Sequence, residues 1–191
     1  MKMNISHKNI EDLSKLLIEE IVNRNLLLCT AESCTGGLLA KILTDMPGSS
    51  VYFKGGIVAY WNEIKNKVLK VKQETLNRYT AVSSFVAIEM AIGVRKIYQC
   101  DLSIAITGYA GPGLGERGEE PGLVYIAISE PSGTQVYEEH FEGDRDSIRN
   151  KSVLKAMIHT LEYIYEWIKG VRQYYKSDEY KEKVTLLKAK K

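Results

Sequence analysis

Hydroxyl, thiol and glycine residues gather in one short segment that follows the apolar run 26–30. The segment reads Ala31-Glu32-Ser33-Cys34-Thr35-Gly36-Gly37 and leads into a helical pattern at Leu38. The first N–H groups of a helix lack partners and favour negative charge, and glycines let a ligand approach the backbone closely. Ser33 is therefore a candidate nucleophile, oxyanion donor or phosphate ligand, with an ordinary helix N-cap as the alternative.

A lysine follows another predicted strand and offers a base for that serine. Asn62 is expected to cap a short helix, which would place Lys65 on its first turn beside Tyr60. A helix N-terminus and burial both lower the pKa of a lysine, as a general base acting on serine requires. The alternative is one surface lysine among several. Glu32 either orients Lys65 or caps backbone donors.

The three cysteines do not suggest a metal or a disulfide framework. Their number is odd, there is no CxxC pair, and no histidine lies at metal-ligand spacing, so neither a metal nor another cofactor is expected. Cys29 and Cys100 border predicted strands and are expected to be small buried hydrophobic residues. Cys34 is the cysteine whose pKa a helix N-terminus could lower, but no histidine is near it in the sequence.

A glycine-rich stretch supplies a third candidate segment. Thr107, Gly108 and Gly111 belong to a turn whose N–H groups could form an anion nest, and a flexible surface loop is the alternative. Residues 113–118 match GxGxxG, but they lead into a strand where a dinucleotide site needs a helix. Because GxxxxGK[ST] is absent as well, a nucleoside-triphosphate P-loop is not indicated.

Two arginines lie four residues apart at the start of the last predicted helix. Arg145 and Arg149 share a face there, and with Asp144 they could clamp a phosphate or a carboxylate. The alternative is ion pairing with the nearby glutamates at 138, 139 and 142.

The elements that must position these residues alternate along the chain. Strands are expected at 26–30, 56–61, 102–107, 123–129 and 135–141. Helices are expected at about 8–23, 38–43, 62–69, from 83 or 84 to 97, and from 144 towards 167. This order predicts a layered α/β domain with a mostly parallel sheet that a final hairpin makes mixed. Ligands of such sheets bind at the carboxyl ends of the parallel strands, where segments 31–37, 60–65 and 107–115 would converge.

Length and charge suggest one domain, residues 1–170, with a basic extension at 171–191. The extension carries a net charge of +4 and the remaining residues carry −2, unlike the basic folded face of most nucleic-acid-binding proteins. No apolar run reaches the roughly 20 residues of a membrane span, and the first residues do not resemble a signal peptide. We therefore expect a cytoplasmic protein that binds neither membrane nor nucleic acid.

Taken together, these segments resemble the C-terminal domain family of the competence/damage-inducible protein CinA. The matching stretches are 30–37, Pro47-Gly48-Ser49-Ser50, 52–60 with Asn62 and Lys65, Ala81-Val82-Ser83, 105–108 with Ala110-Gly111-Pro112, and Phe141 with Gly143-Asp144-Arg145 and Arg149. They cover residues from about 8 to 170. The resemblance implies a three-layer α/β/α fold with a five-stranded mixed sheet, and it is compatible with a homo-oligomer.

The resemblance also implies an activity, because stand-alone members of this family are nicotinamide-nucleotide amidases. Such enzymes hydrolyse the carboxamide of nicotinamide mononucleotide to nicotinic acid mononucleotide and ammonia. By this resemblance Ser33 would be the nucleophile, and Lys65 with Tyr60 would activate it and shuttle the proton. Backbone N–H groups around Thr35, Gly36 and Gly37 would receive the oxyanion. The substrate site would include Glu32, Asn62, Thr107, Gly108, Gly111 and, for the phosphate, Arg145.

The chain departs from the family pattern at one loop. Tyr109 stands where a small aliphatic residue is usual, and residues 114–120 are acidic where a basic residue usually precedes Pro121. Long members also carry an N-terminal nucleotide-hydrolysing domain, which this sequence is not expected to contain. The alternative function is a non-catalytic module that binds a nucleotide or a partner and is linked to competence or DNA damage.

Overall fold

The computed structural model describes residues 9–176, with the side chains described as far as residue 166. Its sheet has five strands in the order β2-β1-β3-β4-β5. The strands are β1 (Leu28–Glu32), β2 (Phe53–Val58), β3 (Leu102–Gly108), β4 (Leu123–Glu130) and β5 (Gly133–His140). β1 pairs in parallel with β2 and β3, whereas β4 is antiparallel to both of its neighbours. The predicted mixed sheet is therefore confirmed.

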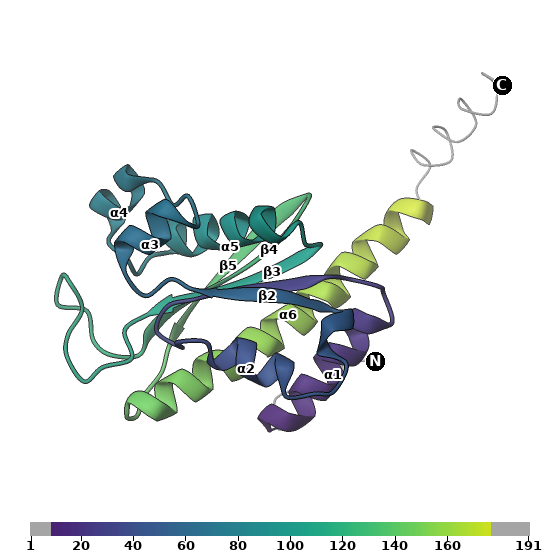
Figure 1. Cartoon of the computed structure of the whole chain (residues 1–191), viewed down its shortest axis with the longest axis horizontal. Coiled ribbons are helices and arrows are strands. Elements are labelled where there is room, and N and C mark those ends of the chain that lie inside the picture. The colour runs from purple at the N-terminus through teal and green to yellow at the C-terminus, as the bar shows by residue number, and fades with distance from the viewer. Residues whose placement is uncertain (1–8, 177–191) are drawn as a thin grey trace, which may run out of the picture.

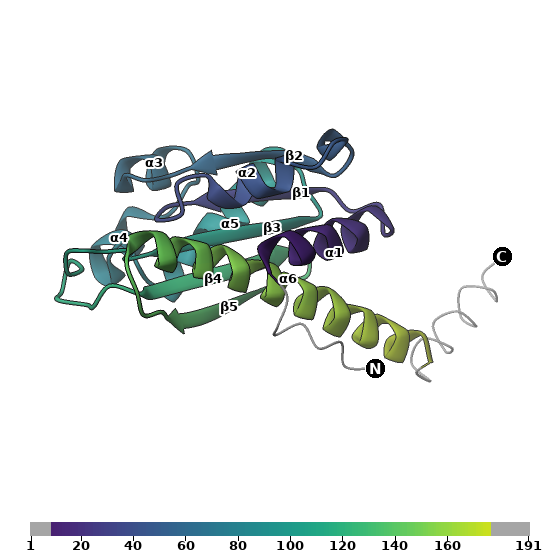
Figure 2. The ribbon, with the colours of Figure 1, turned by 90° about the horizontal axis from the view of Figure 1, so that it is seen from below.

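Helices cover both faces of this sheet and complete the three predicted layers (Figure 1). One face carries α1 (Ile10–Val22), α2 (Leu38–Thr44) and α6 (Arg145–Lys176), which Figure 2 shows in front of the strands. The other face carries α3 (Asn62–Lys67), α4 (Gln73–Tyr79) and α5 (Ser84–Tyr98). A single 3₁₀ turn, η1 (Ser49–Val51), precedes β2.

The two faces of the sheet are packed with side chains of different size. Large aliphatic residues such as Leu28 and Ile104 contact α1, α2 and α6. Small residues such as Ala31 and Ala105 lie beneath α5. Because strand side chains alternate between faces, this difference follows directly from the sequence of β1 and β3. The small residues let α5 pack closely on the sheet. Within α5, Gly93 also lets the backbone of Leu69 come close, because a Cβ at Gly93 would lie 1.9 Å from the Leu69 carbonyl oxygen.

Two strands differ in position from their predictions: β1 lies later along the chain than predicted, and β2 lies earlier. β1 begins and ends two residues after the predicted 26–30, so Ala31 and Glu32 belong to the strand rather than to the turn. β2 begins three residues before the predicted 56–61, and Tyr60 and Trp61 lie beyond its end. In both cases the predicted segment has the same length as the strand but is shifted along the chain, and the pairing of Glu32 with Val58 decides where β1 and the edge strand β2 end.

Helix predictions were mostly confirmed, with two differences. α4 was not predicted, because it is only seven residues long and buries Leu76 alone. α6 begins after Asp144, whose carboxylate accepts the Ser147 N–H as predicted for a cap, and it runs without a break past residue 170. The predicted division into 1–170 and 171–191 stays a prediction, and the helix expected within 178–188 lies outside the described residues.

Candidate active site

The carboxyl ends of β1, β2 and β3 lie side by side and bring the three predicted segments together. The register pairs Glu32 with Val58 of β2 and with Ile106 of β3. Ser33 therefore lies directly beyond the sheet, where its N–H donates to the Ile106 carbonyl at 2.9 Å. The convergence predicted from the alternation of strands and helices is confirmed.

Ser33 and Lys65 meet at this edge of the sheet. The Lys65 Nζ lies 3.1 Å from the Ser33 Oγ, and both side chains are buried, with Lys65 only 1% exposed. The same amine lies 2.8 Å from the Ala59 carbonyl oxygen and 3.3 Å from that of Tyr60. Lys65 thus has three oxygen partners and, among the described residues, no carboxylate that forms an ion pair with it.

Burial changes the acidity of Lys65 in the direction that the sequence suggested. Loss of water around the ammonium lowers the pKa of Lys65 to about 8, while the Cys34 thiol and the Glu116 carboxylate oppose this effect weakly. A substantial fraction of the amine is therefore neutral at a mildly alkaline pH. A neutral amine has two N–H donors and one lone pair, which matches two carbonyls and one hydroxyl.

Glu32 is a structural cap and does not contact Lys65. Its carboxylate accepts the N–H groups of Gly37, Leu39 and Ala40 at 3.1, 3.0 and 2.8 Å. Glu32 is only 1% exposed and does not line the cleft described below, so the structure supports the capping alternative. Helix α2 consequently begins at Leu38, and Ser33 lies five residues before the helix rather than at its first turn.

This cap also changes which N–H groups are available to an oxyanion. The Gly37 N–H is bound to Glu32, and the Gly36 N–H donates to the Ser33 carbonyl at 3.1 Å, so these predicted oxyanion donors are occupied. Among the described residues, no oxygen acceptor pairs with the backbone N–H groups of Cys34 and Thr35, although both act on the adjacent Cys34 sulfur. These two amides adjoin the nucleophile and are free in the sense that no oxygen accepts from them.

A cleft of about 240 Å³ opens onto Ser33 and Lys65. It is lined by Ser33, Cys34, Tyr60, Lys65, Ala81, Val82, Gly108, Tyr109, Ala110, Gly111, Gly113 and Arg145. Among the predicted substrate residues, Gly108, Gly111 and Arg145 lie in this wall, whereas Asn62 does not. Asn62 is an exposed first residue of α3, and Trp61 occupies the N-cap position instead.

Thr107 supports the cleft from behind instead of lining it. It is fully buried, and its hydroxyl donates to the Ala81 carbonyl at 2.8 Å. The predicted role of Thr107 in the pocket wall is therefore wrong. The bond holds segment 81–82 against β3, and this segment is the wall that sequence reasoning missed. The only available signal was its place immediately before the N-cap Ser83.

The remaining polar side chains of the cleft come from Tyr60, Tyr109 and Arg145. The Arg145 guanidinium donates to the Gly111 carbonyl at 2.7 Å and to the Tyr60 hydroxyl at 3.2 Å. Tyr60 thus contacts Lys65 through its backbone carbonyl, and its phenol is engaged by Arg145. Among the described residues, neither arginine forms an ion pair with the glutamates at 138, 139 and 142. Arg149 pairs with Asp146 at 3.5 Å instead, and Arg145 binds Gly111 and Tyr60.

Cys34 lines the cleft but is a poor nucleophile. Burial raises the pKa of the Cys34 thiol to about 12, the opposite of the lowering expected at a helix N-terminus. The reason is that the helix begins four residues after Cys34, so its dipole does not act on the thiol. Cys29 and Cys100 are buried, as predicted.

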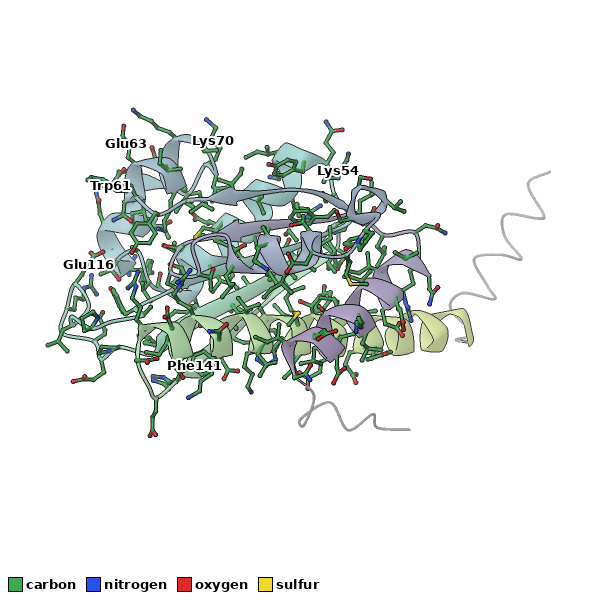
Figure 3. All side chains as sticks on the ribbon, turned by 60° about the horizontal axis from the view of Figure 1, so that its bottom comes forward. Lys54, Trp61, Glu63, Lys70, Glu116 and Phe141 are labelled. Carbon is green, nitrogen blue, oxygen red and sulfur yellow. The ribbon has the colours of Figure 1, made fainter. Side chains whose placement is uncertain are left out.

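The acidic loop lies at the same end of the molecule as this site. Figure 3 shows Glu116 and Trp61 at that end, where residues 109–122 extend beyond β3 and β4. The Arg117 guanidinium donates to the Arg78 carbonyl at 2.8 Å and so attaches the loop to α4. The GxGxxG match within it contains no helix, which agrees with its exclusion as a dinucleotide site.

A second cavity, of about 330 Å³, lies at the opposite end of the sheet. Its wall is mostly apolar, and its carboxylates already have partners: Asp101 accepts the Leu27 N–H, and Glu130 accepts from Ser132 and Tyr163. It therefore offers no free reactive group. Within the described residues, no cluster of metal ligands is present and no helix is long and apolar enough to span a membrane.

Comparison with known proteins places this architecture in one family. Residues 10–164 match the CinA C-terminal domain. A relative from Acetivibrio thermocellus, whose name describes it as competence-damage inducible, is 46% identical over 160 residues, which are 84% of this chain and 38% of that protein. A "CinA-like protein" from Syntrophomonas wolfei is 47% identical over 146 residues, or 76% of this chain and 35% of its own length. The chain thus spans well under half the length of these relatives.

Solved structures agree with this assignment. The crystal structure of a CinA superfamily protein from Klebsiella pneumoniae shares 34% identity and superimposes with a TM-score of 0.82, covering 84% of this chain and 100% of that chain. One from Escherichia coli shares 36% identity with a TM-score of 0.80, covering 85% and 99%. The chain therefore belongs to the CinA C-terminal domain family.

Proposed function

We propose that this chain is a nicotinamide-nucleotide amidohydrolase, which converts the carboxamide of nicotinamide mononucleotide to a carboxylate and releases ammonia. The observation that carries the proposal is the buried contact of 3.1 Å between the Ser33 Oγ and the Lys65 Nζ. A serine beside an amine whose pKa is lowered to about 8 has the general base that amide hydrolysis requires. The substrate class is carried over from the resemblance to the stand-alone amidases of the family.

Lys65 acts as the base in the first step. In its neutral form the amine directs its two N–H groups to the Ala59 and Tyr60 carbonyls, and its lone pair accepts the Ser33 hydroxyl proton. The Ser33 oxygen then forms a bond to the carboxamide carbon. The proton held on Lys65 passes to the nitrogen as the C–N bond breaks, so ammonia leaves and an acyl-serine ester remains.

Backbone amides stabilise the charge that forms in this step. The free N–H groups of Cys34 and Thr35 are the proposed donors to the carbonyl oxygen, since those of Gly36 and Gly37 are occupied. Water then attacks the ester carbon while Lys65 accepts a proton from it, the bond between this carbon and the Ser33 oxygen breaks, and Lys65 returns the proton to Ser33 as the acid product leaves as its carboxylate.

The part of the cleft wall formed by Arg145 is suited to an anionic group of the substrate. Arg145 presents its guanidinium there beside Gly111, and an arginine binds a phosphate through paired hydrogen bonds. The Tyr60 hydroxyl accepts from the same guanidinium and so orients it. A mononucleotide whose phosphate binds Arg145 and whose carboxamide meets Ser33 would use two residues that line the same cleft.

Ammonia release from nicotinamide mononucleotide tests the proposal directly. The wild-type chain is expected to release ammonia, whereas Ser33→Ala and Lys65→Met lose about a thousandfold or more of the rate. Lys67→Met, on the exposed side of α3, is the matched control and keeps the wild-type rate. Nucleotide binding by calorimetry without any ammonia release would overturn the proposal and favour the non-catalytic module.

A further inference from the structure

Arg149 contacts residues 33–37, the nucleophile loop, at a different residue from Lys65. It lies one turn after Arg145 on α6, and its Nη2 donates to the Thr35 carbonyl oxygen at 2.9 Å. Its Nη1 lies 3.5 Å from the Asp146 carboxylate, and its Nε is buried without a partner. Arg149 does not line the cleft, so its charge acts on the backbone rather than on a ligand.

A chain of hydrogen bonds leads from this guanidinium to the residue after the nucleophile. Arg149 binds the carbonyl of the peptide group between Thr35 and Gly36, and the N–H of that same group donates to the Ser33 carbonyl at 3.1 Å. The Ser33 carbonyl belongs to the peptide group whose N–H is that of Cys34. A peptide group is planar, with its C=O and N–H pointing in opposite directions. Two peptide groups are thus aligned in series, and the free N–H of Cys34 is at the end.

The local backbone permits this alignment only with glycine. Gly36 and Gly37 have φ values of +62° and +93°, which residues other than glycine rarely adopt. The Glu32 carboxylate holds the far end of the loop through the Gly37 N–H. The loop is therefore fixed by a cation at Thr35 and by an anion at Gly37.

We infer that Arg149 is a positioning residue that orients and polarises the Cys34 N–H as an oxyanion donor. A positive charge on the first carbonyl makes the Gly36 N–H a stronger donor, and the bond to the Ser33 carbonyl transmits this effect to the Cys34 N–H. A stronger donor at Cys34 stabilises the tetrahedral intermediate more than the bound amide. The inference rests on the proposed function only for the identity of the substrate.

Substitution of Arg149 is expected to lower kcat without weakening substrate binding. With nicotinamide mononucleotide as substrate, Arg149→Met loses about tenfold or more in kcat while KM changes by less than about threefold. Arg145→Met, one turn earlier, shows the opposite pattern, with a raised KM. Arg24→Met is the matched control, since Arg24 also donates to a backbone carbonyl, that of Glu20, but lies in the turn after α1, so its substitution keeps wild-type kinetics.

Rescue by added guanidinium separates this role from mere support of the fold. In Arg149→Ala, guanidinium ion at a concentration that does not denature the protein is expected to restore a part of kcat. Urea at the same concentration is not expected to do so, because urea carries no charge. Circular dichroism confirms that the variants are folded. Unchanged kcat in Arg149→Met, or a loss of kcat that guanidinium fails to restore in a folded Arg149→Ala, would overturn the inference.

A serine-directed fluorophosphonate probe distinguishes failure of the inference from failure of the proposed function. The probe's P=O oxygen occupies the oxyanion position, so Arg149→Met is expected to slow labelling of Ser33 about tenfold, and Ser33→Ala is not labelled. If the wild type is labelled but releases no ammonia from the nucleotide, the substrate proposal fails and the labelling rates alone decide the inference. A wild type that neither reacts nor releases ammonia overturns both.

Discussion

The Ser33 hydroxyl and the Lys65 amine lie 3.1 Å apart although 32 positions separate them in the chain. Both residues follow parallel strands that end at the same level of the sheet, since the last residues of β1 and β2 are paired. The sheet holds Ser33 through the Ile106 carbonyl, and two backbone carbonyls hold Lys65. The pair is therefore positioned by hydrogen bonds to the backbone.

The pH dependence of turnover is expected to follow Lys65. Because the neutral amine is the base, kcat/KM should rise with pH with an apparent pKa of about 8 and then level off. At pH 7 about one tenth of the amine is neutral, so the rate there is about a tenth of the plateau. A stopped-time ammonia assay between pH 6 and 10 measures this. A profile without change above pH 6 would remove Lys65 from the role of base.

Burial of Lys65 also predicts a pH dependence of stability. The pKa of Lys65 is about 8 in the folded chain and near its ordinary value of 10.5 in the unfolded chain, so between these values the unfolded chain binds more protons. The cost of burying the ammonium is present in full below pH 8 and is relieved as the pH rises towards 10.5. Relative to Lys65→Met, the wild-type free energy of unfolding should therefore increase by about 3 kcal/mol over this interval.

Urea titrations of both chains at several pH values check this difference. The comparison with Lys65→Met cancels the titration of tyrosines and cysteines that the two chains share. A constant difference across the interval would contradict the burial of a titrating amine.

Glu32→Gln is expected to destabilise the fold strongly. Both carboxylate oxygens accept hydrogen bonds from backbone N–H groups. In glutamine an NH2 group would replace one of these oxygens, and it cannot accept a hydrogen bond from the N–H that it would then meet. We expect a loss of about 2–4 kcal/mol in the free energy of unfolding, measured in urea. Glu63→Gln is the control, because its pair with Lys67 is exposed and its loss costs less than about 1 kcal/mol. Equal stability of the two variants would refute the capping role.

Cys34→Ala is expected to keep most of the activity. The thiol lies beside Ser33 in the cleft, but burial raises its pKa to about 12, so it is protonated wherever Lys65 is active. The kcat of Cys34→Ala should stay within about threefold of wild type, whereas Ser33→Ala loses at least a thousandfold. A comparable loss in both variants would assign the nucleophile to the thiol instead.

Glu116→Gln is expected to improve binding of an anionic substrate. Its carboxylate lies close enough to the cleft to raise the pKa of Lys65 slightly, and it would repel a phosphate in the same space. We expect KM for nicotinamide mononucleotide to fall about two- to threefold, with the apparent pKa of kcat/KM shifted slightly downward. Glu74→Gln on α4 is the control for a general change of charge. A KM that rises in Glu116→Gln would show that the carboxylate assists binding.

The sequence by itself determined the alternating α/β order, the mixed sheet and the meeting of three loops at one edge of it. These features follow from local patterns: apolar runs, glycine turns and helix periodicity act within a few residues and can be found without the fold. The same patterns marked Ser33 and Lys65, because each stands just beyond a predicted strand.

Only the tertiary structure decided what the neighbouring polar groups do. Glu32, Thr107 and the glycine amides were candidates for ligand contact, and each proved to form a hydrogen bond within the protein itself. The pKa of Cys34 moved opposite to the expectation, since burial outweighs the dipole of a helix that begins farther along the chain. Hydrogen-bond partners and burial depend on segments distant in sequence, such as α6 with Arg149, and no local pattern contains them.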